Sequence, residues 1–156
     1  MTTEVKRILL VEDSQKDIDL ALAALEENQL ANEVIVVRDG EQALDYLFRR
    51  NNFRLRAPGH PAVVLLDLKL PKVSGLEVLA QVKSDESLKT IPVVMLTSSR
   101  EEVDLTQSYQ QGVNAYVVKP VTFVAFVEAL RELGVFWAEI NEPPPGSIAR
   151  KGARTA

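Results

Sequence analysis

Short apolar runs alternate with longer amphipathic stretches along this chain. Residues 7–11 (RILLV) and 33–37 (EVIVV) are brief apolar segments bounded by polar or charged residues, which is typical of buried strands. Residues 14–29 repeat apolar side chains at a helical spacing, and Asp13 or Ser14 is suited to cap that helix. The same alternation predicts further strands at residues 62–67, 92–97 and 115–119, and further helices at residues 39–50, 74–85, 100–112 and 122–140.

Five strands that alternate with five helices predict one α/β domain. Strands that are apolar along their whole length need cover on both faces, and right-handed crossovers between them build a doubly wound parallel sheet. Residues 51–61 are polar and basic and contain two prolines, so we expect a long loop before the third strand.

Polar side chains follow four of the five predicted strands. Glu12 and Asp13 follow the first strand, Asp67 ends the third, Thr97 ends the fourth and Lys119 ends the fifth. The carboxyl ends of parallel strands meet at one edge of a sheet, where ligand sites form. If the first and third strands are neighbours, three carboxylates converge there, and their pKa values would rise unless a cation compensates their charge. Mg²⁺ suits such a group, since it binds a few carboxylates together with waters and phosphate oxygens.

This set of residues is suited to phosphoryl transfer. Asp67 would be the nucleophile, while the Thr97 hydroxyl and the Lys119 ammonium would contact phosphoryl oxygens. Each residue alone also has an ordinary structural explanation: Glu12 and Asp13 can end a strand and cap a helix, and Lys119 can be a surface lysine. The presence of all five at strand ends favours the site.

Composition narrows the classes of protein further. The chain has 156 residues, of which 46% are hydrophobic and 26% charged, as in a soluble globular domain. No apolar run reaches the ~18 residues of a membrane span, no signal-peptide pattern is present, and there is no cysteine, so we expect a cytoplasmic protein. The segment from Pro143 onward carries +3, which leaves −7 on the remainder because the whole chain carries −4. Such an acidic body argues against nucleic-acid binding.

The motifs around these strand ends resemble the receiver domain of two-component response regulators. They are LLVEDS with Glu12 and Asp13, LLDLKLPKVSGLEVL with Asp67, PVVMLTSS with Thr97, and GVNAYVVKP with Lys119. The spacings of 30 residues from Asp67 to Thr97 and 22 from Thr97 to Lys119 are typical of that family. The 54 residues from Asp13 to Asp67 are more than usual, and the predicted loop accounts for the excess. The resemblance spans about residues 5–135.

The resemblance implies a strand order of 2-1-3-4-5 and a signalling protein rather than an enzyme. A histidine kinase would phosphorylate Asp67, and Thr97 and Lys119 would bind the phosphoryl group. Thr97 and Tyr116 would form the conformational switch, and the bond from Lys119 to Pro120 would be cis. The implied Mg²⁺ ligands are Glu12, Asp13, Asp67 and the backbone carbonyl of Lys69. Lys69 itself departs from the family, which often has asparagine or another smaller residue there, and we expect the cation to alter the lifetime of the phosphoryl group.

The C-terminal third of the chain suggests how such a signal would leave the protein. We expect a receiver domain at residues 1–140 and a Pro-rich basic tail at residues 141–156, and we therefore expect no DNA-binding domain. The long loop and the C-terminal segment resemble the stand-alone regulators of bacterial phytochromes, which would make the kinase a phytochrome. The last predicted helix is apolar on more than one face, so we expect a homodimer through Phe136, Trp137 and Ile140, with the tail as a flexible end or a dimer arm.

Two alternatives remain open at this point. A haloacid-dehalogenase-type phosphohydrolase also uses an aspartate nucleophile, but it needs a second acid two residues later, where this chain has Lys69, and it places the nucleophile on the first strand. A receiver-like binding module that is never phosphorylated would lack one of the five site residues, and none is missing. His60, the only histidine, lies in the loop and is expected at the surface.

Overall fold

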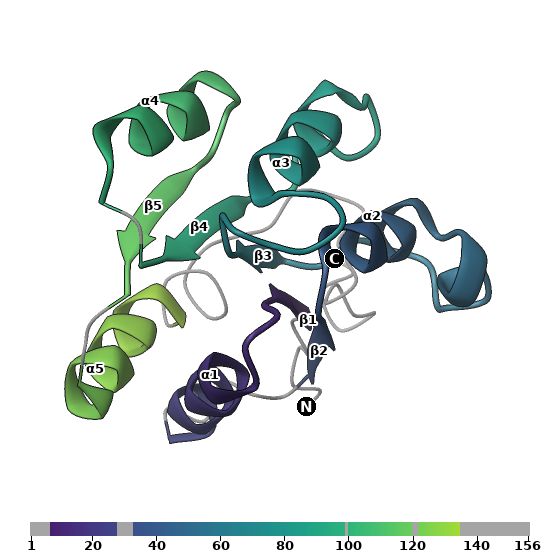
Figure 1. Cartoon of the computed structure of the whole chain (residues 1–156). Helices are drawn as coiled ribbons and strands as arrows, with labels where there is room; N and C mark the ends of the chain where they lie inside the picture. Colours follow the sequence, from purple (N-terminus) through teal and green to yellow (C-terminus); the bar gives the residue numbers. More distant parts are fainter. Residues whose placement is uncertain (1–6, 28–32, 99, 120–121, 135–156) are drawn as a thin grey trace, which may run out of the picture.

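The computed structural model describes residues 7–27, 33–98, 100–119 and 122–134, and its strands and helices alternate along the chain (Figure 1). The strands are β1 (Arg7–Val11), β2 (Glu33–Val37), β3 (Val63–Leu66), β4 (Val93–Thr97) and β5 (Ala115–Val118). The α-helices are α1 (Gln15–Glu27), α2 (Gly40–Phe48), α3 (Gly75–Ser84), α4 (Glu102–Gln110) and α5 (Phe123–Gly134), and one 3-10 helix, η1 (Asn51–Phe53), lies in the predicted loop. The five strands and five α-helices are confirmed, with ends that differ by a few residues, while residues 135–140 of the last predicted helix lie outside the described part.

The five strands form one parallel sheet in the order β2-β1-β3-β4-β5, as the resemblance implies. The order reverses at β1, which pairs with both β2 and β3. Val11 at the end of β1 is opposite Val37 of β2 and Leu66 of β3. The residues that follow β1 and β3 therefore emerge side by side, at the position where doubly wound sheets bind ligands.

Helices cover both faces of the sheet. α1 and α5 pack together on one face, and α2, α3 and α4 cover the other (Figure 1). Successive strand residues point to opposite faces. Ile8 and Leu10 accordingly join the core beneath α1 and α5, while Leu9 and Val11 join the core beneath α2 and α3. This is why the strand sequences are apolar without alternation.

Side-chain caps fix where three helices begin. Ser14 Oγ accepts from the backbone N–H of Asp17 at 3.3 Å, so Ser14 rather than Asp13 caps α1. Asp39 caps α2 by accepting from the N–H of Gln42 at 2.7 Å, and Ser74 caps α3 in the same way. Each cap satisfies an N–H that the helix leaves without a partner, which orients the helix against its strand.

The loop between α2 and β3 is held by Arg56. Its Nε donates to the carbonyl of Tyr46 at 2.7 Å, its Nη1 donates to the carbonyl of Gly59 at 3.0 Å, and its guanidinium lies 4.2 Å from the Tyr46 ring centroid. His60 is half-buried rather than exposed, because the loop packs beside Asp85 and Ser87.

Among the helices of the described segments, none is long and apolar enough to cross a membrane.

Candidate functional site

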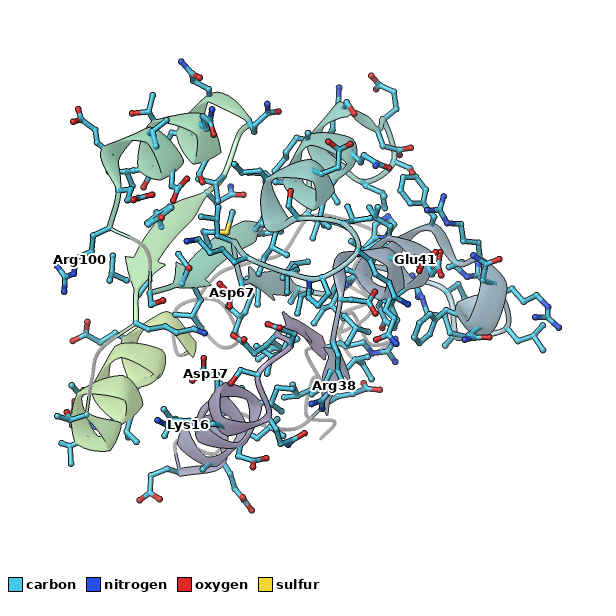
Figure 2. The ribbon with its side chains drawn as sticks, in the orientation of Figure 1. Lys16, Asp17, Arg38, Glu41, Asp67 and Arg100 are labelled. Carbon is cyan, nitrogen blue, oxygen red and sulfur yellow. The ribbon has the colours of Figure 1, made fainter. Side chains whose placement is uncertain are left out.

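Strand pairing places two acidic residues next to each other at the carboxyl edge of the sheet. The N–H of Asp67 donates to the carbonyl of Val11 at 3.1 Å, and the N–H of Glu12 donates to the carbonyl of Val37 at 3.0 Å. Each residue thus continues its strand by one position before the chain turns away. Glu12 is 3% exposed and the Asp67 side chain 13% exposed, so both carboxylates are largely removed from water. Figure 2 shows Asp67 near the centre of the molecule, where β3 ends.

Three carboxylates gather at this edge, as the sequence predicts. Glu12, Asp13 and Asp67 each offer an oxygen, and these oxygens lie within 4.8 Å of one another. Asp13 is exposed, whereas Glu12 is buried, so the cluster opens to solvent on one side. Oxygen donors that can converge from a partly open site fit a hard divalent cation such as Mg²⁺, which keeps several waters. The residues present therefore fit the metal that the pattern indicates.

Lys119 places a positive charge against this cluster. Its ammonium Nζ lies 2.5 Å from Glu12 Oε1, 3.0 Å from Asp17 Oδ2 and 3.5 Å from Asp67 Oδ2, and its side chain is 11% exposed. The backbone N–H of Lys119 donates to the carbonyl of Thr97 at 2.8 Å, which fixes the lysine just beyond the ends of β4 and β5. A buried ammonium with carboxylate partners is the arrangement that low-dielectric surroundings require.

The electrostatics of the cluster perturb two groups. Burial raises the pKa of Glu12 to about 7, and the charge of Asp67 acts in the same direction, while the hydrogen bond from Lys119 opposes the rise. Burial would by itself lower the pKa of Lys119, but its hydrogen bond to Glu12 and the charges of Asp67 and Glu12 raise it. The cluster thus holds more negative charge than one ammonium balances, which favours a bound cation.

Thr97 and Tyr116 lie on the same face of the sheet. Thr97 is the last residue of β4, is 2% exposed, and is opposite Val118 of β5. Tyr116 is half-buried, is opposite Met95, and packs against the core beneath α2 and α3. Because Met95 and Thr97 are two residues apart, their side chains leave the same face, which Tyr116 shares. A threonine hydroxyl at the strand end and a tyrosine behind it fit the predicted switch pair.

Gly75 supports the segment that carries Asp67. It is the first residue of α3, and its N–H donates to the carbonyl of Leu68 at 2.8 Å. A Cβ at this position would overlap the carbonyl oxygen of Asp67 and would lie 2.8 Å from the Cα of Leu68. Only glycine allows the helix start and the chain after β3 to approach this closely.

The structure adds one residue that sequence reasoning missed and leaves others untested. Asp17, in the first turn of α1, contacts Lys119, although an acid there is already explained by the helix N-terminus. The Lys69 side chain is exposed, and the role of its carbonyl stays a prediction. The cis bond at Pro120 and the dimer contacts of Phe136, Trp137 and Ile140 lie outside the described residues.

Comparison with known proteins agrees with this geometry. The response regulator receiver domain family matches residues 8–131. The response regulator Rcp1 of Synechocystis sp. (strain PCC 6803) is 40% identical over 134 residues, which cover 86% of this chain and 90% of Rcp1. The structure of the Mn²⁺-bound form of Rcp1 superposes with a TM-score of 0.82 at 38% identity, covering 89% of this chain and 99% of that one.

Two further solved structures are similar. The phosphorylated cyanobacterial phytochrome response regulator RcpA superposes with a TM-score of 0.83 at 40% identity, covering 89% of this chain and 98% of that chain. The bacteriophytochrome response regulator RtBRR is 66% identical with a TM-score of 0.73, covering 92% and 87%. The family match over most of the chain, the strand order and the acidic edge agree, and on these grounds the chain belongs to the response regulator receiver domain family.

Proposed function

We propose that this chain is a stand-alone response regulator that accepts a phosphoryl group on Asp67 from a partner histidine kinase. The observation that carries the proposal is the position of Asp67, largely buried beside Glu12 and 3.5 Å from the Lys119 ammonium. The similarity of this chain to RcpA, whose solved structure is phosphorylated, also supports phosphorylation. The alternatives fit less well, because the acid pair follows β1 and Asp67 follows β3, the reverse of a haloacid-dehalogenase-type phosphohydrolase.

The transfer step follows from these positions. A carboxylate oxygen of Asp67 attacks the phosphorus of a phosphohistidine, the new P–O bond forms, and the P–N bond breaks with its electron pair leaving on the imidazole. Lys119, whose ammonium is 3.5 Å from Asp67, would donate to one phosphoryl oxygen, and the Thr97 hydroxyl would donate to another. Water later attacks the phosphorus, and the P–O bond to Asp67 breaks, which releases inorganic phosphate and regenerates the carboxylate. The exposed cation of Lys69 lies two residues from this reacting centre.

A divalent cation belongs to this proposal. Glu12, Asp13 and Asp67, with the carbonyl of Lys69, would hold Mg²⁺, which would neutralise phosphoryl charge when bound. The chain's own residues exclude bulk water from Asp67 and hold the ammonium beside it. The relative Rcp1 has been solved in a Mn²⁺-bound form, which supports a divalent cation in this chain as well.

The output of the switch is a change of surface. Phosphorylation would draw Thr97 toward the phosphoryl group and let Tyr116 change rotamer behind it. The names of RcpA and RtBRR support a phytochrome as the upstream kinase.

We further propose a cytoplasmic protein with a receiver at residues 1–140, a tail at residues 141–156, and a homodimer through Phe136, Trp137 and Ile140. A monomeric mass by light scattering at micromolar concentration would contradict the dimer.

The experiment that tests the phosphoacceptor is a measurement of intact mass. The wild type and Asp67→Asn are each incubated with acetyl phosphate, once in the presence of Mg²⁺ and once in the presence of a chelator. The wild type should gain one phosphoryl group with Mg²⁺ only, and Asp67→Asn should gain none. An equal gain in both proteins would assign the chemistry to another residue and refute the proposal.

A further inference from the structure

Two sets of carboxylates overlap at the carboxyl edge of the sheet. Glu12, Asp13 and Asp67 can share a metal ion, while Glu12, Asp17 and Asp67 contact the Lys119 ammonium. Glu12 and Asp67 therefore belong to both sets. Asp17 contacts the ammonium and does not belong to the group whose oxygens lie within reach of one cation.

This overlap creates a competition between two cations. The ammonium has three N–H donors, and its three carboxylate contacts match that number. A divalent cation on Glu12 and Asp67 would draw away two of the three partners, and its charge would repel the ammonium at short range. Lys119 is only 11% exposed, so it cannot regain full hydration without moving out of the site. Once the metal ion is bound, the ammonium can stay in the site only if its third carboxylate partner, Asp17, holds it there.

The position of Asp17 suits it to hold the Lys119 ammonium. Its backbone N–H donates to Ser14 Oγ in the first turn of α1, and its carboxylate is 3.0 Å from Lys119 Nζ with a side chain that is 33% exposed. Figure 2 shows Asp17 on α1, below Asp67 in this view. Asp19, two residues along the same helix, instead accepts a hydrogen bond from Gln15 Nε2 at 2.7 Å. The contact with Lys119 is thus specific to Asp17 among the aspartates of α1.

We propose that Asp17 is a positioning residue that holds the Lys119 ammonium while Mg²⁺ occupies Glu12 and Asp67. The ammonium, held by Asp17, and the metal ion, held by Glu12, Asp13 and Asp67, can then occupy the same site together. The inference rests on the metal assignment of the proposed function and extends it to a residue outside the metal and phosphoryl-binding groups.

The test is Mg²⁺ affinity by isothermal titration calorimetry, without any phosphodonor. Asp17→Asn should raise the Kd for Mg²⁺ at least five-fold, because Lys119 then retains only the carboxylates that the metal needs. Asp17→Glu keeps the charge and should restore the Kd to within two-fold of the wild type. The matched control Asp19→Asn removes the same charge from the same helix and should change the Kd less than two-fold.

A double-mutant cycle separates positioning from simple charge. In a Lys119→Met background there is no ammonium to hold, so adding Asp17→Asn should change the Kd less than two-fold. An equal factor in both backgrounds would mean that Asp17 acts only through its charge, and would overturn the inference. If Lys119→Met does not fold, as circular dichroism would reveal, the Asp17→Glu variant decides, since a failure to restore the Kd also overturns it. Because no phosphodonor is present, failure here is distinct from failure of Asp67 to accept a phosphoryl group.

Discussion

Replacing Gly75 with alanine should both destabilise the protein and slow phosphorylation of Asp67. The added Cβ would overlap the carbonyl oxygen of Asp67 and lie 2.8 Å from the Cα of Leu68. Carbon atoms in contact are ordinarily about 3.5–4.0 Å apart, so the two segments must separate by about 0.7 Å or more. The clashing atoms are backbone and cannot rotate away, and the displacement therefore reaches Asp67 itself.

The magnitude follows from the cost of overpacking. Inserting a methyl group into a closely packed site costs about 1–3 kcal/mol. For a chain of this size each kcal/mol lowers Tm by about 2–4 °C, so Tm should fall by about 2–12 °C. Helix propensity alone has the opposite sign, since alanine favours a helix over glycine by up to about 1 kcal/mol. A misplacement near 1 Å can cost up to about 100-fold in rate, and we expect at least a ten-fold slower phosphorylation.

The assay combines thermal denaturation by circular dichroism with the initial rate of phosphorylation from acetyl phosphate at saturating Mg²⁺. The matched control is Ala80→Gly in the same helix, which should lose about 1 kcal/mol of stability and keep the wild-type rate. A Gly75→Ala variant with an unchanged or higher Tm and an unchanged rate would refute the role assigned to the contact between α3 and Asp67.

Other perturbations test separate parts of the account. Lys69→Asn should change the half-life of the phosphorylated protein at least several-fold in a dephosphorylation assay, and equal half-lives would remove any role for this cation. Burial and the charge of Arg56 lower the pKa of His60, so the unfolded chain binds a proton at this residue more readily than the folded protein does, and stability should fall as pH drops below about 6.5. The contribution of Glu12 to stability has the opposite dependence on pH. Because its pKa is raised to about 7 in the folded protein, stability should fall as pH rises toward 7. Urea unfolding of the wild type and His60→Gln at pH 7.5 and 5.5 isolates the contribution of the histidine. If both proteins lose the same stability between the two pH values, the loss cannot be assigned to His60.

The strands and the acidic edge could be predicted because each depends on local sequence. An apolar run such as residues 63–66 identifies a strand covered on both faces, and a polar residue directly after it must lie at the carboxyl edge. Once β1 and β3 are neighbours, the convergence of Glu12 and Asp67 follows from parallel pairing alone. The ends of helices were predicted less well, since α4 begins at Glu102 rather than residue 100.

What the sequence could not predict depends on tertiary contacts. Asp17 reaches Lys119 across 102 positions of the chain, and nothing in its local pattern distinguishes it from an ordinary first-turn acid. The loop before β3 is predicted from its composition, but the contact of Arg56 with the ring of Tyr46 is not. His60 was expected at the surface because prolines surround it, yet the packing of that loop beside Ser87 buries part of the ring.

The most direct measurement of the central claim is the chemical location of the phosphoryl group. Reduction of the phosphorylated protein with borohydride converts an aspartyl phosphate to homoserine, which peptide mass spectrometry then locates. Homoserine is expected at position 67 in the wild type, in proportion to the gain in intact mass, and none is expected when a chelator is present during the incubation with the phosphodonor. Homoserine at position 13 or another acid, or a phosphoryl group that resists reduction, would contradict the assignment of Asp67 as the phosphoacceptor.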